Sequence, residues 1–119
     1  MATALIVDDV EVTRFALSHC LKDLGHDQAE AHDPESARHA LSRRRYDVVF
    51  LDWHLKKQSG LDLIAAIHQH APGTPVIVIS GVEGEDKAEE ARRAGADAFL
   101  TKPLDSERVA AAMRRAGAA

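Results

Sequence analysis

Short hydrophobic runs recur along the chain, and each has a length suited to a β-strand. They occupy residues 5–7, 48–51, 76–79 and 98–100. The first three contain no polar position and are rich in β-branched residues, a pattern typical of parallel strands buried on both faces. Residues 28–31 form a weaker, half-polar run, which indicates a strand at the edge of the sheet.

Helical periods fill the gaps between these runs. The spacing predicts helices over residues 11–24, 34–44, 84–94 and 106–115, and another from residue 61 to the Pro72-Gly73 pair. Asp33 and Pro34 are typical of an N-cap and of a first helical position. In the helix over 11–24, the period rests on these apolar positions: Val12, Phe15, Ala16, Cys20 and Leu24.

Strand and helix thus alternate five times, which predicts a single α/β domain over residues 1–119. Alternating elements build a parallel sheet, and right-handed crossovers place helices on both of its faces. A chain of 119 residues is long enough to bury one core.

Composition excludes some classes of function. The formal net charge is −4, so a chain-wide nucleic-acid surface, which needs a basic excess, is not expected. No apolar run approaches ~18 residues and the start lacks the basic segment of a signal peptide, so the predicted location is the cytoplasm. The lone cysteine, Cys20, lies in an apolar stretch and is interpreted as a small core residue.

Reactive side chains follow four of the five predicted strands. In chain order they are Asp8 and Asp9, then Asp52, then Ser80 with Gly81, and finally Thr101, Lys102 and Pro103. In open α/β sheets, ligands bind beyond the carboxyl ends of the strands, so these groups are predicted to meet at one edge. A simpler interpretation is that the aspartates only cap loops and that Lys102 only forms an ordinary ion pair. That interpretation explains each residue alone, but it does not explain why all of them occur at strand ends.

Three aspartates at one edge repel one another, which would raise the pKa of at least one of them. Lys102 offers one compensating charge, and a divalent cation with oxygen ligands offers two. Mg²⁺, or the similar Mn²⁺, suits a site with few carboxylates that also receives a phosphate. Asp52 would then be the nucleophile in phosphoryl transfer, with space left by Gly81 and a hydrogen bond from Ser80 to a phosphoryl oxygen.

The segments LIVDDVEVTR, VVFLDWHLKKQSGLDL, PVIVISG and GADAFLTKP together resemble the receiver domain of two-component response regulators. The likeness covers nearly the whole chain. It implies a (βα)₅ flavodoxin-like fold with strand order 2-1-3-4-5. It also implies that Asp52 accepts a phosphoryl group from a phosphohistidine on a sensor histidine kinase or a histidine phosphotransfer protein. Neither nucleic acid nor a membrane is expected as a direct partner.

The resemblance implies the metal ligands as well. Asp9, Asp52 and the backbone carbonyl of His54 would bind Mg²⁺, and Asp8 would act mainly through a bridging water. Proline often stands four residues after the phosphoacceptor in receivers, whereas this chain has Lys56. The His54 side chain, together with Val82, is hypothesised to control the access of water to the phosphorylated aspartate.

The remaining implied roles concern the phosphate and the output. Lys102 would bind phosphoryl oxygens, and the Lys102–Pro103 peptide would be cis. Ser80 would shift toward the phosphate and Phe99 would follow inward as the rotamer switch. The fourth helix, fifth strand and fifth helix would form the face where a downstream protein or a second copy docks.

Three other functions stay open. A flavin or nucleotide binder of the same fold would be expected to carry G-x-G-x-x-G or G-x-x-x-x-G-K-S/T, and the chain has neither. An aspartyl phosphatase would need its nucleophile after the first strand and a cap region for the substrate. A degenerate receiver that only binds proteins would not need the complete set of reactive residues.

Overall fold

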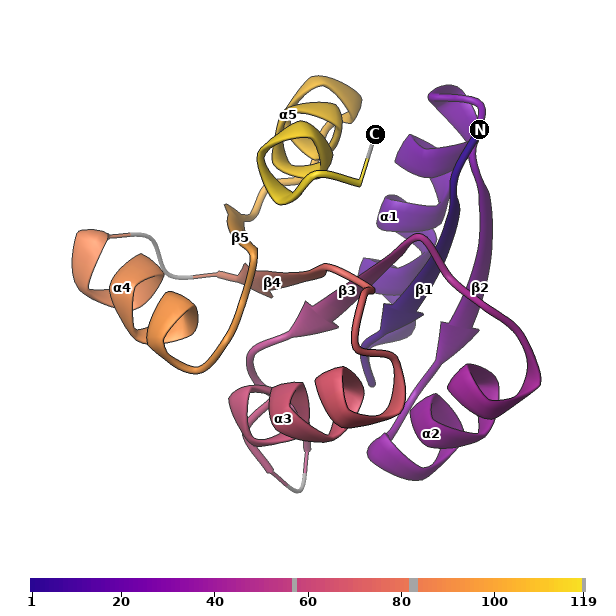
Figure 1. Ribbon diagram of the computed structural model, residues 1–119. Helices are drawn as coiled ribbons and strands as arrows, with labels where there is room; N and C mark the ends of the chain where they lie inside the picture. The colour runs from indigo at the N-terminus through magenta and orange to yellow at the C-terminus, as the bar shows by residue number, and fades with distance from the viewer. Residues whose placement is uncertain (57, 82–83, 119) are drawn as a thin grey trace.

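The computed structural model describes residues 1–56, 58–81 and 84–118. Within these residues, strands and helices alternate along the chain (Figure 1). Their bounds are β1 (Thr3–Val7), α1 (Glu11–Asp23), β2 (Asp27–Ala31), α2 (Pro34–Arg43), β3 (Val48–Asp52), α3 (Leu61–His70), β4 (Val76–Ser80), α4 (Glu85–Arg93), β5 (Ala98–Thr101) and α5 (Ser106–Ala116). All ten predicted elements are confirmed, with ends that differ by one or two residues.

The five strands form one parallel sheet with the order β2-β1-β3-β4-β5. This confirms the predicted flavodoxin-like topology, including the edge position of the half-polar strand β2. The order also decides which strand ends are neighbours. β1 and β3 lie side by side in the middle of the sheet, so Asp8 and Asp52 follow adjacent strands.

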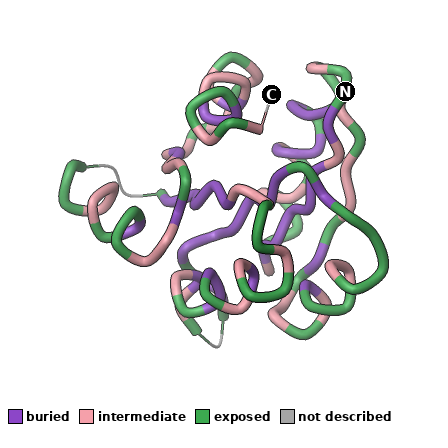
Figure 2. The backbone as a smooth tube through the Cα atoms, in the orientation of Figure 1, coloured by how far each residue is buried: buried purple, intermediate pink, exposed green. Residues whose placement is uncertain are grey.

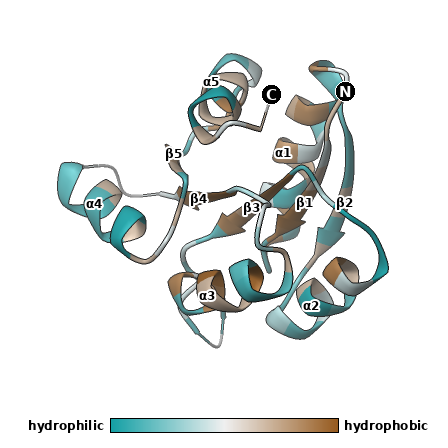
Figure 3. Ribbon diagram, in the orientation of Figure 1, coloured by the Kyte–Doolittle hydropathy of each residue, from teal (hydrophilic) through white to brown (hydrophobic). Residues whose placement is uncertain are grey.

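Two hydrophobic layers cover the sheet, and this explains why the strand sequences are continuously apolar. On one face, Leu5 and Val7 of β1 pack with residues of α2, α3 and α4. On the other, Ala4 and Ile6 pack with residues of α1 and α5. Figure 2 shows the buried strands between the more exposed helices, and Figure 3 shows the contrast between hydrophobic β3 and hydrophilic α4.

Two of the apolar positions that set the helical period of α1 are exposed. Val12 and Phe15 are 76% and 74% exposed, whereas Leu17, Cys20 and Leu21 are buried against the sheet and α5. Helical residues are about 100° apart, so Phe15 lies nearly opposite Leu17 on the helix surface. Both are hydrophobic, and the apolar period alone does not distinguish the covered side from the exposed one. Cys20 is a buried core residue, as predicted.

The loop after β3 folds back closely onto the end of that strand. The Gly60 N–H donates to the Trp53 carbonyl at 2.6 Å, and His54 forms an isolated antiparallel bridge with Ser59. A Cβ atom at Gly60 would lie 2.0 Å from the backbone oxygen of Asp52. Glycine is therefore required here because another backbone segment occupies the space of a side chain.

We predict that Gly60→Ala destabilises the protein by about 2 kcal/mol or more, since the added methyl displaces the backbone at the end of β3. Urea unfolding followed by circular dichroism measures the change. Gly73→Ala is the matched control: Gly73 has open space around its Cβ position and should change the free energy of unfolding by less than about 0.5 kcal/mol. Equal stability of both variants would contradict the close approach of Gly60 to the backbone of Asp52.

Candidate functional site

Three carboxylates converge at the carboxyl edge of the sheet. Asp8 follows β1, Asp9 comes next, and Asp52 is the last residue of β3. One carboxylate oxygen from each lies within 4.8 Å of the others. The side chains of Asp8 and Asp52 are buried and Asp9 is half-buried. The predicted convergence of the three aspartates is thus confirmed.

Hydrogen bonds from the backbone fix the two aspartates of the first loop. Asp8 Oδ1 accepts from the Val10 N–H at 2.8 Å, and Asp9 Oδ2 accepts from the Lys56 N–H at 2.7 Å. The second of these bonds links the loop after β1 to the loop after β3. A proline at position 56 has no N–H and could not make it. The departure at Lys56 therefore adds a hydrogen bond to the site through the backbone of that residue.

Arg14 of α1 holds the same loop from outside. Its Nη1 donates to the backbone carbonyl of Asp8 at 2.7 Å, and its Nε pairs with Glu30 Oε1 at 3.0 Å. Sequence reasoning did not single out Arg14, because a contact between a helix side chain and a loop carbonyl leaves no periodic pattern.

Ser80 and Lys102 lie at the same edge, on the other side of Asp52. Ser80 ends β4 and is buried, and its carbonyl accepts from the Lys102 N–H at 2.9 Å. The peptide bond between Lys102 and Pro103 is cis, as predicted. Gly81 borders open space, since a Cβ there would have no neighbouring atom within 4 Å. In the described part of the chain, the Lys102 ammonium forms no ion pair within 4.0 Å.

Burial and charge together disfavour ionisation of the buried carboxyls. Burial is the largest influence on Asp8 and raises its pKa to about 6; the Val10 hydrogen bond opposes this shift, and repulsion from Asp52 adds to it. Burial likewise raises the pKa of Asp52, while the positive charge of Lys102 is the main influence that lowers it. The cluster therefore carries negative charge that this chain compensates only in part.

The donor set fits a small divalent cation. Asp8 Oδ2 is buried and has no hydrogen-bond partner among the described residues, and an unsatisfied buried oxygen is a marker of an ion or water position. Three carboxylate oxygens close together are hard ligands of the kind that Mg²⁺ and Mn²⁺ prefer. The cluster could therefore hold such a metal.

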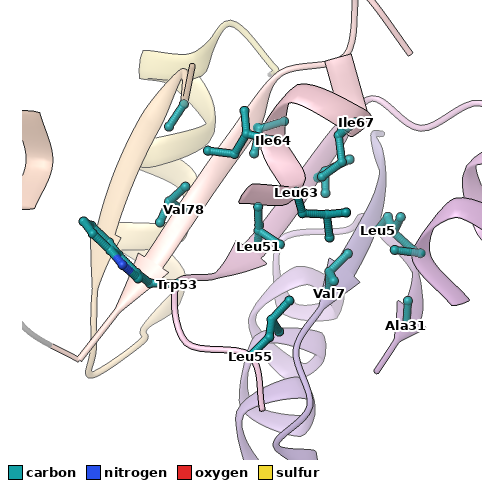
Figure 4. Close-up of a cluster of buried hydrophobic side chains, with 14 of the residues drawn as sticks. Leu5, Val7, Ala31, Leu51, Trp53, Leu55, Leu63, Ile64, Ile67 and Val78 are labelled. Carbon is teal, nitrogen blue, oxygen red and sulfur yellow. The ribbon is translucent and has the colours of Figure 1, made fainter. Parts of the chain in front are cut away.

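Trp53 connects the end of β3 with α4 and β5. Its buried ring meets Phe99 edge to face, with centroids 6.1 Å apart, and the Lys87 ammonium of α4 lies 4.9 Å from the ring centroid. Figure 4 shows Trp53 at the border of the hydrophobic cluster beside Val78. The His54 side chain is exposed, and Val82, its hypothesised partner in controlling water, lies outside the described residues.

Comparison with known proteins gives consistent matches. A family model for the response regulator receiver domain matches residues 4–114. The chain is 41% identical over 115 residues to the response regulator protein PilR of Pseudomonas aeruginosa, covering 93% of this chain but 26% of PilR. The chain thus spans about a quarter of the length of that relative.

Two solved structures extend the comparison. A response regulator of Burkholderia pseudomallei superposes with a TM-score of 0.84 at 30% identity, over 94% of this chain and 66% of that one; its crystal contains a phosphorylated aspartic acid, a calcium ion and citrate. The chemotaxis protein CheY4 of Vibrio cholerae superposes with a TM-score of 0.87 at 27% identity, over 98% of both chains.

A raised pKa at Asp8 predicts a specific pH dependence of stability. The folded protein binds this proton more tightly than the unfolded chain, so Asp8 lowers stability as the pH rises from about 4 through about 6. In metal-free buffer, Asp8→Asn should therefore be more stable than the wild type by about 1–3 kcal/mol at pH 7.5, with little difference near pH 4.

Urea unfolding across this pH range, with a chelator present, measures the difference. Asp62→Asn replaces an exposed aspartate of α3 and should show no such pH dependence. If Asp8→Asn were more stable than the wild type by the same amount at pH 4 and at pH 7.5, the raised pKa of Asp8 would be contradicted. Saturating Mg²⁺ should reduce the advantage at pH 7.5, because the wild type has one more carboxylate for the metal.

Proposed function

We propose that this chain, which belongs to the response regulator receiver domain family, is a phosphorylation-controlled switch with Asp52 as its phosphoacceptor. The observation that carries the proposal is the meeting of Asp52 with Asp8 and Asp9 at one edge of the sheet, beside the loop that carries Lys102. As a member of a signalling family, the chain would catalyse only its own phosphorylation and dephosphorylation.

In the proposed reaction, an ionised oxygen of Asp52 attacks the phosphorus atom of a phosphohistidine. The new oxygen–phosphorus bond forms as the nitrogen–phosphorus bond of the donor breaks, and the histidine leaves. Asp8, Asp9, Asp52 and the His54 carbonyl would hold the metal, Asp8 mainly through water. The bound metal would neutralise charge on the phosphoryl oxygens.

The chain's own cation and hydroxyl would complete the stabilisation of the phosphoryl group. Lys102 would bind one phosphoryl oxygen with its ammonium, and Ser80 would donate its hydroxyl proton in a hydrogen bond to another. Open space at Gly81 supports this proposal, since the phosphoryl group needs room on that side of Asp52.

The proposed signal passes from Ser80 to Phe99 and then to the surface formed by α4, β5 and α5. Ser80 would move toward the phosphate, and Phe99, now half-buried, would turn inward behind it. The edge-to-face contact between Phe99 and Trp53 supports the proposal, because a turn of Phe99 changes the packing of a ring adjacent to Asp52. A downstream protein or a second copy would then bind the altered surface.

A degenerate receiver that only binds proteins is the alternative to test against. It would have no need for an unsatisfied buried oxygen on Asp8 beside Asp52, a combination that lowers stability until a cation or a water molecule satisfies that oxygen. A flavin or nucleotide binder is less well supported still, because an acidic edge repels phosphate unless a metal is present.

The phosphodonor would be a sensor histidine kinase or a histidine phosphotransfer protein of the cytoplasm. Val10, Val12 and Phe15 are exposed hydrophobic residues at the start of α1, directly after Asp8 and Asp9. A partner that brings its phosphohistidine to Asp52 must cover the rim of the site. These residues are suited to that contact, because they bury apolar surface when it forms.

Asp52→Asn should abolish phosphorylation, because the amide is not a nucleophile. Wild type and variant are incubated with phosphoramidate and Mg²⁺ and compared by intact mass and by Phos-tag electrophoresis. The wild type should gain one phosphoryl group only when Mg²⁺ is present, and the variant none. A wild type that gains no phosphoryl group from phosphoramidate or from any histidine kinase would be a degenerate receiver.

Phe15→Ser should slow phosphotransfer by about 10-fold or more when the donor is a histidine kinase that phosphorylates the wild type. The reason is that exposed aromatic residues are common binding hot spots. Labelling by phosphoramidate should not change, because a small donor needs no docking surface. Lys22→Ala, at the other end of α1, is the control and should affect neither rate. Equal losses with both donors would show that Phe15 acts on the site and not on docking.

A further inference from the structure

Arg108 reaches from the first turn of α5 back to the loop that carries Lys102. Its Nη2 donates to Thr101 Oγ1 at 2.6 Å, and its Nη1 donates to the backbone carbonyl of Pro103. These two acceptors belong to the residues immediately before and after Lys102. One guanidinium group therefore ties both neighbours of the lysine to the same helix.

The helix that carries Arg108 is a firm anchor. Asp105 Oδ1 accepts from the Arg108 N–H at 2.8 Å and so caps the start of α5. Val109, Ala112 and Met113 of the same helix are fully buried against the sheet. By contrast, the backbone of Lys102 itself has one hydrogen bond to the sheet, at the Ser80 carbonyl. Thr101 and Lys102 attach the start of the loop to β4, and Arg108 adds a second attachment, to α5.

Among the described residues, the hydrogen bonds of the Arg108 side chain go to Thr101 and Pro103. Arg92 and Arg93, on α4, pair with Glu89 on the surface, but Arg108 has no ion pair in the part of the chain that the structure describes. Its side chain is half-buried. The planar, rigid fork of arginine suits two separate acceptors better than the single point charge of lysine does.

We propose that Arg108 is a positioning residue for Lys102, an inference that rests on the proposed function. By holding Thr101 and Pro103, Arg108 restricts the direction in which the Lys102 side chain leaves the backbone. The ammonium is then already directed at the edge where the phosphoryl group on Asp52 would lie. Arg108 acts through the geometry of the loop and does not contact the phosphoryl group.

Four proteins test the coupling: the wild type, Arg108→Leu, Lys102→Ala and the double variant. Their phosphorylation rates with phosphoramidate and Mg²⁺ are measured by intact mass. Arg108→Leu should slow the wild type ~10-fold, because small misplacements of a catalytic group reduce rates strongly. In the Lys102→Ala background, the same substitution should change the rate less than ~2-fold, since the group that it positions is gone.

Three further variants separate positioning from folding. Thr101→Val removes one acceptor without changing the shape of the side chain, and it should slow the reaction in the same direction. Thr101→Val replaces Arg108→Leu as the test variant if Arg108→Leu does not fold. Arg108→Lys should recover part of the lost rate. Arg114→Leu, which removes an exposed arginine of the same helix, should have no effect.

The affinity for Mg²⁺ provides a second readout. Trp53 is the only tryptophan, and because it directly follows Asp52 we expect its fluorescence to change when a metal binds there. Arg108→Leu should leave the affinity unchanged, because the metal ligands are on other loops. Three results would each overturn the inference. They are an unchanged phosphorylation rate in Arg108→Leu, a double variant whose rate loss equals the product of the two single losses, and a weakened Mg²⁺ affinity in Arg108→Leu. A wild type that is never labelled would overturn the proposed function and this inference with it.

Discussion

Repulsion among three carboxylates at one edge of the sheet is the constraint on which the rest of this structure depends. Parallel strands β1 and β3 end side by side, and their ends carry Asp8, Asp9 and Asp52. Burial raises the pKa of both Asp8 and Asp52. A folded domain keeps such a cluster at the expense of stability, and a divalent cation relieves the repulsion. The proposed chemistry uses the same imbalance, since a site short of positive charge favours binding of a metal, and the bound metal would in turn attract the phosphoryl group.

Contacts from neighbouring elements hold this edge in place, and most of them involve the backbone. The Lys56 N–H binds Asp9, Arg14 binds the Asp8 carbonyl, and Arg108 binds both neighbours of Lys102. Each contact joins a loop to a different loop or helix. The charged groups are thereby positioned before any ligand arrives, which would reduce the reorganisation needed during the proposed reaction.

Much of the fold and of the site could be predicted from the sequence, for physical reasons. Continuous apolar runs such as Val76–Ile79 predict strands covered on both faces, and their carboxyl ends place Asp8 and Asp52 together. The exposed side of α1 could not be predicted, because Phe15 is as hydrophobic as the residues that are buried. The contacts of Lys56 and Arg108 were also missed. A backbone donor has no residue type to recognise, and a long side chain can reach several acceptors.

The chemical identity of the phosphorylated residue is the most direct measurement of the central claim. The protein is phosphorylated with phosphoramidate and Mg²⁺ and then reduced with borohydride, which converts an aspartyl phosphate to homoserine. Peptide mass spectrometry locates the homoserine. The account predicts homoserine at position 52 and at no other aspartate. Homoserine at Asp8 or Asp9, or a phosphoryl group on a histidine or serine, would contradict it.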